Sequence, residues 1–377
     1  MAIDDRLSAA GPAMHEPTAI RAAQVVLPCA DLDPTVEFFV DRLGFRLDVI
    51  FPADDPSVAV LSGHGVTVRL ARALGGAAGH LRLLCDDPGT EASVIAPNGT
   101  VIEFVDADPP LHVPAVAQEL VVTRLDGGAH WIVGRAGMRY RDLIPGRLGG
   151  AFIASHIHIP DAGPVADYVH FHDVRFQMIF CAGGWVRLVY EDQGEPFVLE
   201  AGDCVLQPPH IRHRVLECST DLEVVEIGCP AEHETYVEHL IQLPTARVRA
   251  DREFAGQRFT RHRAAGAAWR AWHRSGFESR DLGIGEATRG LAGARVVRPV
   301  VESAGGPWGD RLAHDTEFQF LFVLSGTVGL DGESGDVVRL ERGDAVSIPG
   351  SFRWLLCDPA PDLELLDVTL PASVTPR

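Results

Sequence analysis

The chain has 377 residues and a formal net charge of −19 at pH 7, with 46% hydrophobic residues, 38 glycines and 26 prolines. So acidic a surface repels phosphate backbones and anionic headgroups, and we expect no nucleic-acid partner and no membrane partner. No early apolar stretch resembles a signal peptide, and no run reaches the length of a membrane span. The seven scattered cysteines show no zinc-type pairing, which favours reduced thiols and a cytoplasmic location. Short apolar runs between glycines and prolines favour several β-rich domains.

Residues 1–19 form a polar tail that we expect to be disordered, and residues 20–108 combine short strands with one helix. Asp31 and Pro34 are typical of a helix start, and Gly44 is typical of a helix end. Strands are expected at 24–29, 45–51, 58–62, 66–71 and 80–85, and after the turn Pro97-Asn98-Gly99. These elements predict a small α+β domain of βαβββ type.

The order of these elements resembles the glyoxalase/vicinal-oxygen-chelate family. The resemblance rests on Asp-Leu before the helix, Leu-Gly-Phe after it and Pro-Asn-Gly-x-x-Ile-Glu near the end. It implies that Gln24 and Glu103 occupy two positions that ligate metal in that family. Too few residues lie between 85 and 97 for the second helix and its strand, so we expect a degenerate domain with a scaffold, dimerisation or lid role. In that case Glu103 is an ordinary edge-strand carboxylate.

Three histidines in the next segment, 109–244, have the spacing of a metal site. His170 and His172 are two residues apart, so they point to the same face of a strand. His213 follows the break at Pro208-Pro209, where a returning strand can carry it to the same interior. Imidazole suits zinc, copper, iron and nickel, and such a ligand set leaves positions open for water, oxygen or substrate. The spacing therefore predicts a catalytic metal site.

The same segment resembles the cupin family in both of its sequence motifs. The matching positions are Gly163, His170, His172, Gln177 and Gly184 in the first motif, and Gly202, Pro208 and His213 in the second. Gln177 stands where the family usually has glutamate, and His210 stands at a glycine position. The resemblance implies a β-barrel that holds a metal through three histidines, with Gln177 as a weak ligand or a hydrogen-bonding group. A metal-free binding barrel is the alternative.

A second copy of the module follows at an offset of 141 residues. The segment 221–230 reappears at 362–371, which indicates a duplicated domain and predicts a C-terminal cupin at 245–377. The histidine positions are not kept in this copy: His172 corresponds to His314 and Gln177 to Gln319, but His170 corresponds to Leu312 and His213 to Trp354. One imidazole and an amide hold a metal poorly. We therefore predict one metal site, in the first barrel only.

The predicted fold is mainly β, with two cupin barrels preceded by a small α+β domain. The cupin resemblance implies Fe(II), or another divalent metal such as Mn, Ni or Zn, with dioxygen as co-substrate. We predict a non-haem iron mono- or dioxygenase that cleaves or rearranges a small cyclic phenolic, enolic or heteroaromatic substrate, such as an oxazinomycin-type conversion of a pyridine ring to an oxazine. The alternatives are a lyase or isomerase that uses the metal as a Lewis acid, and a non-enzymatic binding protein. The expected partner is a small molecule, and a homodimer is an open alternative to a monomer.

Residues near the motif are candidates for further roles. Tyr168 and His210 are candidates for moving a proton, and Arg175, Gln207 and Arg212 are candidates for substrate binding. Beyond them, the segment 233–243 has the pattern of a short helix.

Overall fold

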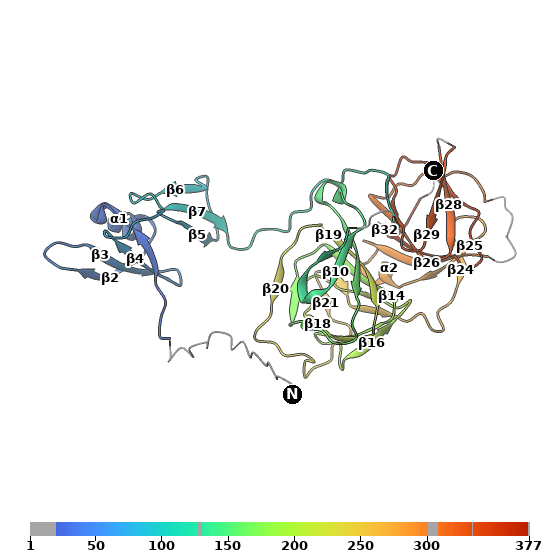
Figure 1. Cartoon of the computed structure of the whole chain (residues 1–377), viewed down its shortest axis with the longest axis horizontal. Coiled ribbons are helices and arrows are strands. Elements are labelled where there is room, and N and C mark those ends of the chain that lie inside the picture. Colours follow the sequence, from blue (N-terminus) through green and yellow to red (C-terminus); the bar gives the residue numbers. More distant parts are fainter. Residues whose placement is uncertain (1–19, 127–129, 301–307, 334, 376–377) are drawn as a thin grey trace, which may run out of the picture. The chain divides into compact units, whose positions relative to one another are not determined.

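The computed structural model describes residues 20–126, 130–300, 308–333 and 335–375. The chain divides into two compact units, Met1–Pro110 and Leu111–Arg377. Figure 1 follows the chain from the first unit in blue, through a first barrel in green and yellow, to a second barrel in orange and red. We describe each unit by itself.

The first unit begins with the predicted strand, helix and three strands. These elements are β1 (Val25–Pro28), α1 (Leu32–Glu37), the π-helix η1 (Phe38–Arg42), β2 (Arg46–Phe51), β3 (Val58–Gly63) and β4 (Val66–Ala71). They form a sheet of order β1-β4-β3-β2 in which β1 and β4 run parallel. Leu32 and Phe39 are buried against the sheet. Gly44, at φ +73°, ends the helical segment in a conformation that glycine adopts without strain.

A second, shorter sheet completes the first unit. It contains β5 (His80–Cys85), β6 (Ser93–Ile95) and β7 (Val101–Asp106) in the order β5-β7-β6, with β5 parallel to β7. The connection 86–92 between β5 and β6 contains no helix. The second half of this domain is therefore reduced, as the short spacing in the sequence predicted.

The first barrel consists of two facing antiparallel sheets. Its elements are β9 (Ile132–Val133), η2 (Arg135–Gly137), β10 (Arg139–Asp142), η3 (Arg147–Gly150), β11 (Ile153–Ile159), β12 (Gly163–Pro164), β13 (His170–His172), β14 (Phe176–Gly183), β15 (Trp185–Tyr190), β16 (Phe197–Glu200), β17 (Cys204–Leu206), β18 (His213–Cys218), β19 (Leu222–Cys229) and β20 (Thr235–Val237). One sheet has the order β17-β14-β19-β11-β10-β9, and the other has the order β16-β15-β18-β13-β20.

The second barrel repeats this plan. After the small hairpin β21 (Glu253–Phe254) and β22 (Gln257–Arg258), its elements are β24 (Arg270–Ala271), β25 (Phe277–Asp281), α2 (Ile284–Ala287), β26 (Gly293–Pro299), β27 (Phe318–Ser325), β28 (Thr327–Gly332), β29 (Val337–Glu341), β30 (Ala345–Ser347), β31 (Trp354–Cys357) and β32 (Glu364–Leu370). The sheets run β24-β25-β26-β32-β27-β30 and β29-β28-β31. The order β17-β14-β19-β11 of the first barrel thus matches β30-β27-β32-β26 of the second.

The two barrels exchange one strand each. The strand β8 (Val121–Thr123) precedes the first barrel in sequence but pairs with β30 of the second. Conversely, β23 (Thr260–His262) precedes the second barrel and pairs with β17 of the first. Equivalent aspartates fasten both strands: Asp344 accepts from the Leu125 amide at 2.9 Å, and Asp203 accepts from the Ala264 amide at 2.8 Å. The chain therefore ties the two barrels together from both sides.

An apolar core lies between the barrels. On β14, Phe176, Met178 and Phe180 point into this core, and β27 contributes Phe318, Phe320 and Phe322. Phe152 stacks on Phe318 with 4.1 Å between ring centroids. Because side chains alternate along a strand, the residues between these, Gln177 and Ile179, face the interior of the first barrel. The packing of the barrels thus fixes which face of β14 reaches the interior.

The segment 233–243 and the cysteines can be compared with what the sequence predicted for them. The prediction of a helix at 233–243 is wrong: Thr235–Val237 form the strand β20, which pairs with β13 and suits their β-branched and aromatic side chains. All seven cysteines are free, as the sequence predicted. No helix in the described part of the chain is long and apolar enough to cross a membrane.

An ion pair across the barrels generates a pH prediction. Glu223 of the first barrel lies 3.1 Å from Nε2 of His156 and 2.9 Å from Nη2 of Arg342 in the second barrel. His156, and then Arg342, lower the pKa of Glu223 to about 2 from its ordinary 4.5. A depressed carboxyl pKa stabilises the fold above the ordinary pKa, and that stabilisation is lost as the pH falls toward 2.

We therefore expect Glu223→Gln to lower the free energy of unfolding by about 2 kcal/mol at pH 7. The loss should be clearly smaller at pH 3, as measured by urea denaturation at both pH values. The control is Glu217→Gln, which removes an exposed pair with Arg187 and should have little effect at either pH. An equal loss at pH 7 and pH 3 would contradict the prediction.

Candidate metal centre

The structure brings together the three histidines of the sequence motif. β13 carries His170 and His172 on one face, and β18 begins at His213, whose backbone pairs with His170. The candidate ligand atoms of the three rings lie within 4.8 Å of one another, and all three residues are buried. No other group of three His, Cys, Asp or Glu side chains converges in this way among the described residues. This cluster is therefore the candidate metal centre.

The hydrogen bonds of the rings decide which nitrogen faces the centre. Each ring uses Nδ1 outside it: His170 bonds the Tyr168 carbonyl at 2.8 Å, His172 the Thr235 hydroxyl at 3.0 Å and His213 the Ile211 carbonyl at 3.0 Å. A carbonyl only accepts, so Nδ1 of His170 and His213 carries the proton and Nε2 keeps its lone pair. The buried Nε2 of His170 has no partner among the described residues. Nε2 of His213 lies 3.5 Å from Nε2 of Gln207. An Nδ1 that is bonded outside the centre is typical of metal-ligating histidines.

Burial keeps the three imidazoles neutral. It is the largest cause that lowers the pKa of each ring, to about 3 for His172 and well below the ordinary 6.5 for His213. The positive charge of Arg135 lowers all three pKa values further. Because a metal binds only the neutral ring, no proton has to leave before the ion enters. The donor set therefore fits a divalent metal ion.

A chain of hydrogen bonds with a fixed direction runs beside the centre. The Tyr190 hydroxyl donates to Oε1 of Gln207 at 2.5 Å, Nε2 of Gln207 donates to Oε1 of Gln177 at 3.1 Å, and Nε2 of Gln177 donates to Glu226 at 2.6 Å. An ionised carboxylate only accepts, so the last amide must present its NH₂ group to Glu226. Oε1 of Gln177 must then accept from the NH₂ group of Gln207, and Oε1 of Gln207 must accept from the Tyr190 hydroxyl.

Gln177 therefore has protein partners at both ends of its amide. Its oxygen receives Gln207 and its nitrogen holds Glu226. We assign the ligand set to the three histidines and assign Gln177 the task of holding Glu226. The glutamine in place of the family's glutamate thus moves the negative charge from β14 to the neighbouring strand β19.

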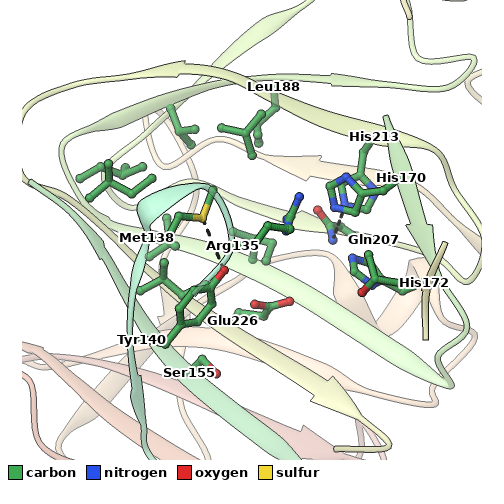
Figure 2. Close-up of a pocket in the computed structure, with 18 of the residues that line it drawn as sticks. Arg135, Met138, Tyr140, Ser155, His170, His172, Leu188, Gln207, His213 and Glu226 are labelled. Carbon is green, nitrogen blue, oxygen red and sulfur yellow. Dashed lines mark hydrogen bonds between the residues drawn. The ribbon is translucent and has the colours of Figure 1, made fainter. Parts of the chain in front are cut away.

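The histidines open into an elongated cavity of about 260 Å³. Aliphatic side chains form most of its wall: Ile153, Ile157, Ile159, Ile179, Val186, Leu188, Val215, Leu222 and Val224. The polar lining residues other than the triad are Arg135, Tyr140, Ser155, Gln207, Glu226, His233 and Thr235. Figure 2 shows Arg135 and Glu226 between the histidines and the end formed by Met138 and Tyr140. Burial, and then Glu226, raise the pKa of Tyr140 to about 12, so its hydroxyl stays protonated.

Arg135 belongs to the turn between β9 and β10 and is held in place by Asp167. Its Nη1 bonds Oδ1 of Asp167, whose side chain is fully buried and whose Oδ2 accepts from the Val215 amide at 2.9 Å. The guanidinium also lies over the Tyr168 ring. A guanidinium has five N–H donors, so Arg135 can bind Asp167 and a further acceptor in the cavity at the same time.

The structure places the other candidate residues of the sequence as follows. Gln207 lines the cavity. The remaining four are not among its lining residues: Tyr168 is 41% exposed, His210 bonds Asp173 at 2.9 Å, Arg175 bonds Glu317 at 2.7 Å and Arg212 bonds Glu238 at 3.1 Å. Tyr168 still contributes through its backbone, because its carbonyl orients His170.

Sequence reasoning missed three charged residues of this site, Arg135, Asp167 and Glu226. A signal existed for Glu226, since the repeat has an acid, Asp367, at the equivalent position. A signal also existed for Arg135, since Arg135-x-Gly137 and Arg141 recur as Arg274-x-Gly276 and Arg280. Asp167 is not one of the motif positions, and no pattern in the sequence distinguishes it.

The second barrel has no such centre among its described residues. Leu312 pairs with Trp354, as His170 pairs with His213 in the first barrel. The guanidinium of Arg274 lies 3.6 Å from the centroid of the Trp354 ring. His314 is fully used, with Nε2 at 3.1 Å from the Ile348 carbonyl and Nδ1 bonded to Thr316.

In the small domain, the two residues suggested by the chelate-family resemblance do not form a ligand cluster with other described side chains. Glu103 lies 3.6 Å from Nε2 of His80 and 3.4 Å from Nε of Arg82. Gln24 is exposed just before β1. Glu103 is thus a strand carboxylate paired with neighbouring side chains, and the family resemblance of residues 20–108 stays a prediction.

Fold and site together define a two-barrel cupin-fold protein whose described residues contain one three-histidine cluster able to hold a metal. The chain matches no protein-family model and no curated protein sequence. Similar solved structures include a mutant of salicylate 1,2-dioxygenase from Pseudoaminobacter salicylatoxidans in complex with gentisate, at 15% identity and a TM-score of 0.50, covering 71% of this chain and 88% of that one.

Two further similar structures have lower TM-scores. Oxalate decarboxylase from Bacillus subtilis has 12% identity and a TM-score of 0.49, covering 70% of this chain and 80% of that one. Protein YlbA from E. coli has 10% identity and a TM-score of 0.48, covering 70% and 96%. At these identities a likeness shows the fold alone. The likeness to the dioxygenase structure confirms the prediction of a mainly β, bicupin architecture.

The first prediction from the site concerns metal content. We expect about one divalent metal per chain, lost on His170→Ala, His172→Ala or His213→Ala and retained on the control His314→Ala. Elemental analysis of the purified variants measures this directly. Two metals per chain, or loss of metal from the His314 variant, would place the centre elsewhere.

The second prediction concerns the pair Gln177 and Glu226. Gln177→Glu sets two carboxylates against each other, so we expect it to cost about 2 kcal/mol of stability at neutral pH. Combining it with Glu226→Gln reverses the pair: the carboxylate at position 177 then accepts from both amides. Thermal unfolding should therefore show the double variant near the wild-type melting temperature. A double variant no more stable than Gln177→Glu would refute the fixed direction of the hydrogen-bond chain.

Proposed function

We propose that the first barrel is the active site of a non-haem Fe(II)-dependent oxygenase. The observation that carries the proposal is the set of three neutral imidazoles, each presenting Nε2 to one end of a buried, largely aliphatic cavity. Three nitrogens leave coordination positions free for a substrate and a small co-substrate. Imidazole also suits Mn, Ni and Zn, so the ion itself is part of the proposal.

The residues of the cavity favour an anionic, cyclic substrate. A neutral ligand set leaves the metal its full positive charge, and the low-dielectric wall strengthens its attraction for an anion. The largely aliphatic wall suits the faces of a ring. We therefore propose a small phenolic, enolic or heteroaromatic substrate. A bound ferrous ion would supply the one-electron chemistry through which dioxygen reacts with such a compound.

The chain's own residues then bind and orient that substrate. Arg135, anchored by Asp167, contributes N–H donors near the metal end of the cavity. Tyr140 stays protonated because its pKa is raised to about 12, so it donates a hydrogen bond. Arg135 lies in the turn η2 and Tyr140 in the strand β10 that follows it, so one segment of the chain supplies both donors to the cavity.

Two other functions use the same centre. A lyase or isomerase would use the metal only as a Lewis acid, and a sensor or carrier would bind the ligand without turnover. The salicylate 1,2-dioxygenase structure shares the fold of this chain, and the oxygenase proposal itself rests on the three imidazoles and their cavity.

Oxygen dependence separates these functions. With ferrous protein and a screened phenolic or enolic substrate, we expect turnover to stop without oxygen, to resume on aeration and to place labelled oxygen in the product. Nitric oxide, an oxygen surrogate, should give a high-spin paramagnetic resonance signal that changes when substrate is added. His172→Ala is the control and should show neither signal nor turnover. Undiminished anaerobic turnover, or equal activity with zinc, would replace the oxygenase by a Lewis-acid enzyme.

A further inference from the structure

Glu226 is a half-buried carboxylate in the metal cavity, and no arginine or histidine of the described chain pairs with it within salt-bridge distance. Nε2 of Gln177 donates to its Oε1 at 2.6 Å. The second oxygen is left to accept from another donor. A carboxylate that lines an apolar cavity without a cation is costly unless something else compensates it.

The second barrel shows how the same position is compensated elsewhere. There the equivalent pair is Gln319 and Asp367, joined at 3.3 Å, and Nε of Arg295 lies 3.6 Å from Asp367. Arg295 pairs with Asp367 across β26 and β32, just as Ser155 pairs with Glu226 across β11 and β19. A serine that lines the cavity thus stands where the second barrel has its arginine. The first barrel thus keeps the acid and the amide but has no arginine at this position, and the space beside Glu226 belongs to the cavity.

Glu226 and Arg135 therefore offer opposite hydrogen-bonding groups to a ligand in the cavity. Glu226 only accepts hydrogen bonds, and Arg135 only donates them. Arg135, held by Asp167, lines the same cavity as the three histidines. Figure 2 shows both side chains beside the triad, Arg135 from the turn η2 and Glu226 from the strand β19. A ligand that satisfies both must carry an acceptor near the metal and a donor away from it.

We propose that the cavity selects a monoanionic ring compound that carries a hydroxyl or ring N–H donor separate from its metal-binding oxygens. Glu226 accepts a hydrogen bond from this donor, and Arg135 faces the anionic, metal-binding edge. The divalent ion and Arg135 together outweigh Asp167 and Glu226, so the loaded cavity keeps an excess of positive charge that a monoanion neutralises. This inference rests on the metal centre of the proposed function, but it concerns binding and not the reaction.

The test compares ligands that share one chelating edge. 2-Hydroxybenzoate supplies a carboxylate and a hydroxyl to the metal, and its 2,3-, 2,4-, 2,5- and 2,6-dihydroxy analogues add one further hydroxyl at different places on the ring. Affinities are measured anaerobically by calorimetry with ferrous full-length protein, so no turnover intervenes. We expect at least one dihydroxybenzoate to bind the wild-type protein about tenfold more tightly than 2-hydroxybenzoate, as one hydrogen bond to a charged acceptor provides.

Glu226→Gln should abolish that gain. Because Gln177 presents its NH₂ group, the new amide must turn its oxygen toward Gln177 and its own NH₂ toward the ligand, which places a donor against a donor. 2-Hydroxybenzoate itself should bind this variant at least as tightly as the wild-type protein, because the substitution removes a negative charge from the cavity. The matched control, Glu217→Gln on the surface of β18, should keep the full tenfold gain. Glu226→Asp keeps the carboxylate but moves it away from the ligand, because the side chain is one methylene shorter. This variant should retain part of the tenfold gain in affinity.

Metal content and the nitric oxide signal are recorded for every variant, so that failure of the proposed function can be distinguished from failure of the ligand-selection inference. If the wild-type protein binds no metal and gives no nitric oxide signal, the metal centre and the proposed function are both wrong. If they persist, a gain that survives Glu226→Gln unchanged would overturn the inference. So would a wild-type protein that binds nitric oxide but shows no preference for any dihydroxybenzoate. Should Glu226→Gln lose metal, the Glu226→Asp variant decides: a gain equal to that of wild type would count against the inference.

Discussion

Three imidazoles removed from water at one point constrain the whole first barrel. A buried nitrogen without a partner costs about 1–3 kcal/mol, so the fold must supply an acceptor for each Nδ1–H and can leave Nε2 unpaired only where a ligand compensates it. The carbonyls of Tyr168 and Ile211 and the hydroxyl of Thr235 meet the first demand. These groups lie next to β13 and β18 and on β20, so the pairing of these strands sets the orientation of the three imidazoles.

The exchange of strands between the barrels supports the same site. β17 pairs on one side with β14 and on the other with β23, which lies beyond the first barrel in sequence. Gln207 directly follows β17 and links Tyr190 to Gln177, so the position of this amide depends on both pairings. The equivalent arginines Arg141 and Arg280 each donate to a glycine carbonyl of the other barrel, at Gly343 and Gly202. The second barrel thus contributes rigidity to a site to which it supplies no ligand.

The sequence predicted the parts of this structure that follow from spacing. Residues two apart on a strand must share a face, and a repeat at fixed offset must fold twice, so the three histidines and the two barrels were within reach. It did not predict the strand exchange, because pairing partners of β8 and β23 are set by packing and not by local pattern. Arg135 was missed for a similar reason: its place in the cavity depends on Asp167, which is 32 residues away along the chain. The helix expected at 233–243 failed because pairing with β13 determines the conformation of Thr235–Val237.

The two barrels treat buried charge in opposite ways. In the second barrel, burial raises the pKa of Asp367, and the nearby arginines Arg295 and Arg274 oppose that shift. Arg274 is itself buried against Trp354, and burial lowers its pKa to about 10. All of these charges are supplied by the protein, and they fill the interior permanently. In the first barrel Ser155 stands where the second barrel has Arg295, the acid remains, and an open cavity leads to three neutral nitrogens. Because the half-buried Glu226 has no ion-pair partner among the described residues, a ligand with a hydrogen-bond donor can complete the bonding of this site.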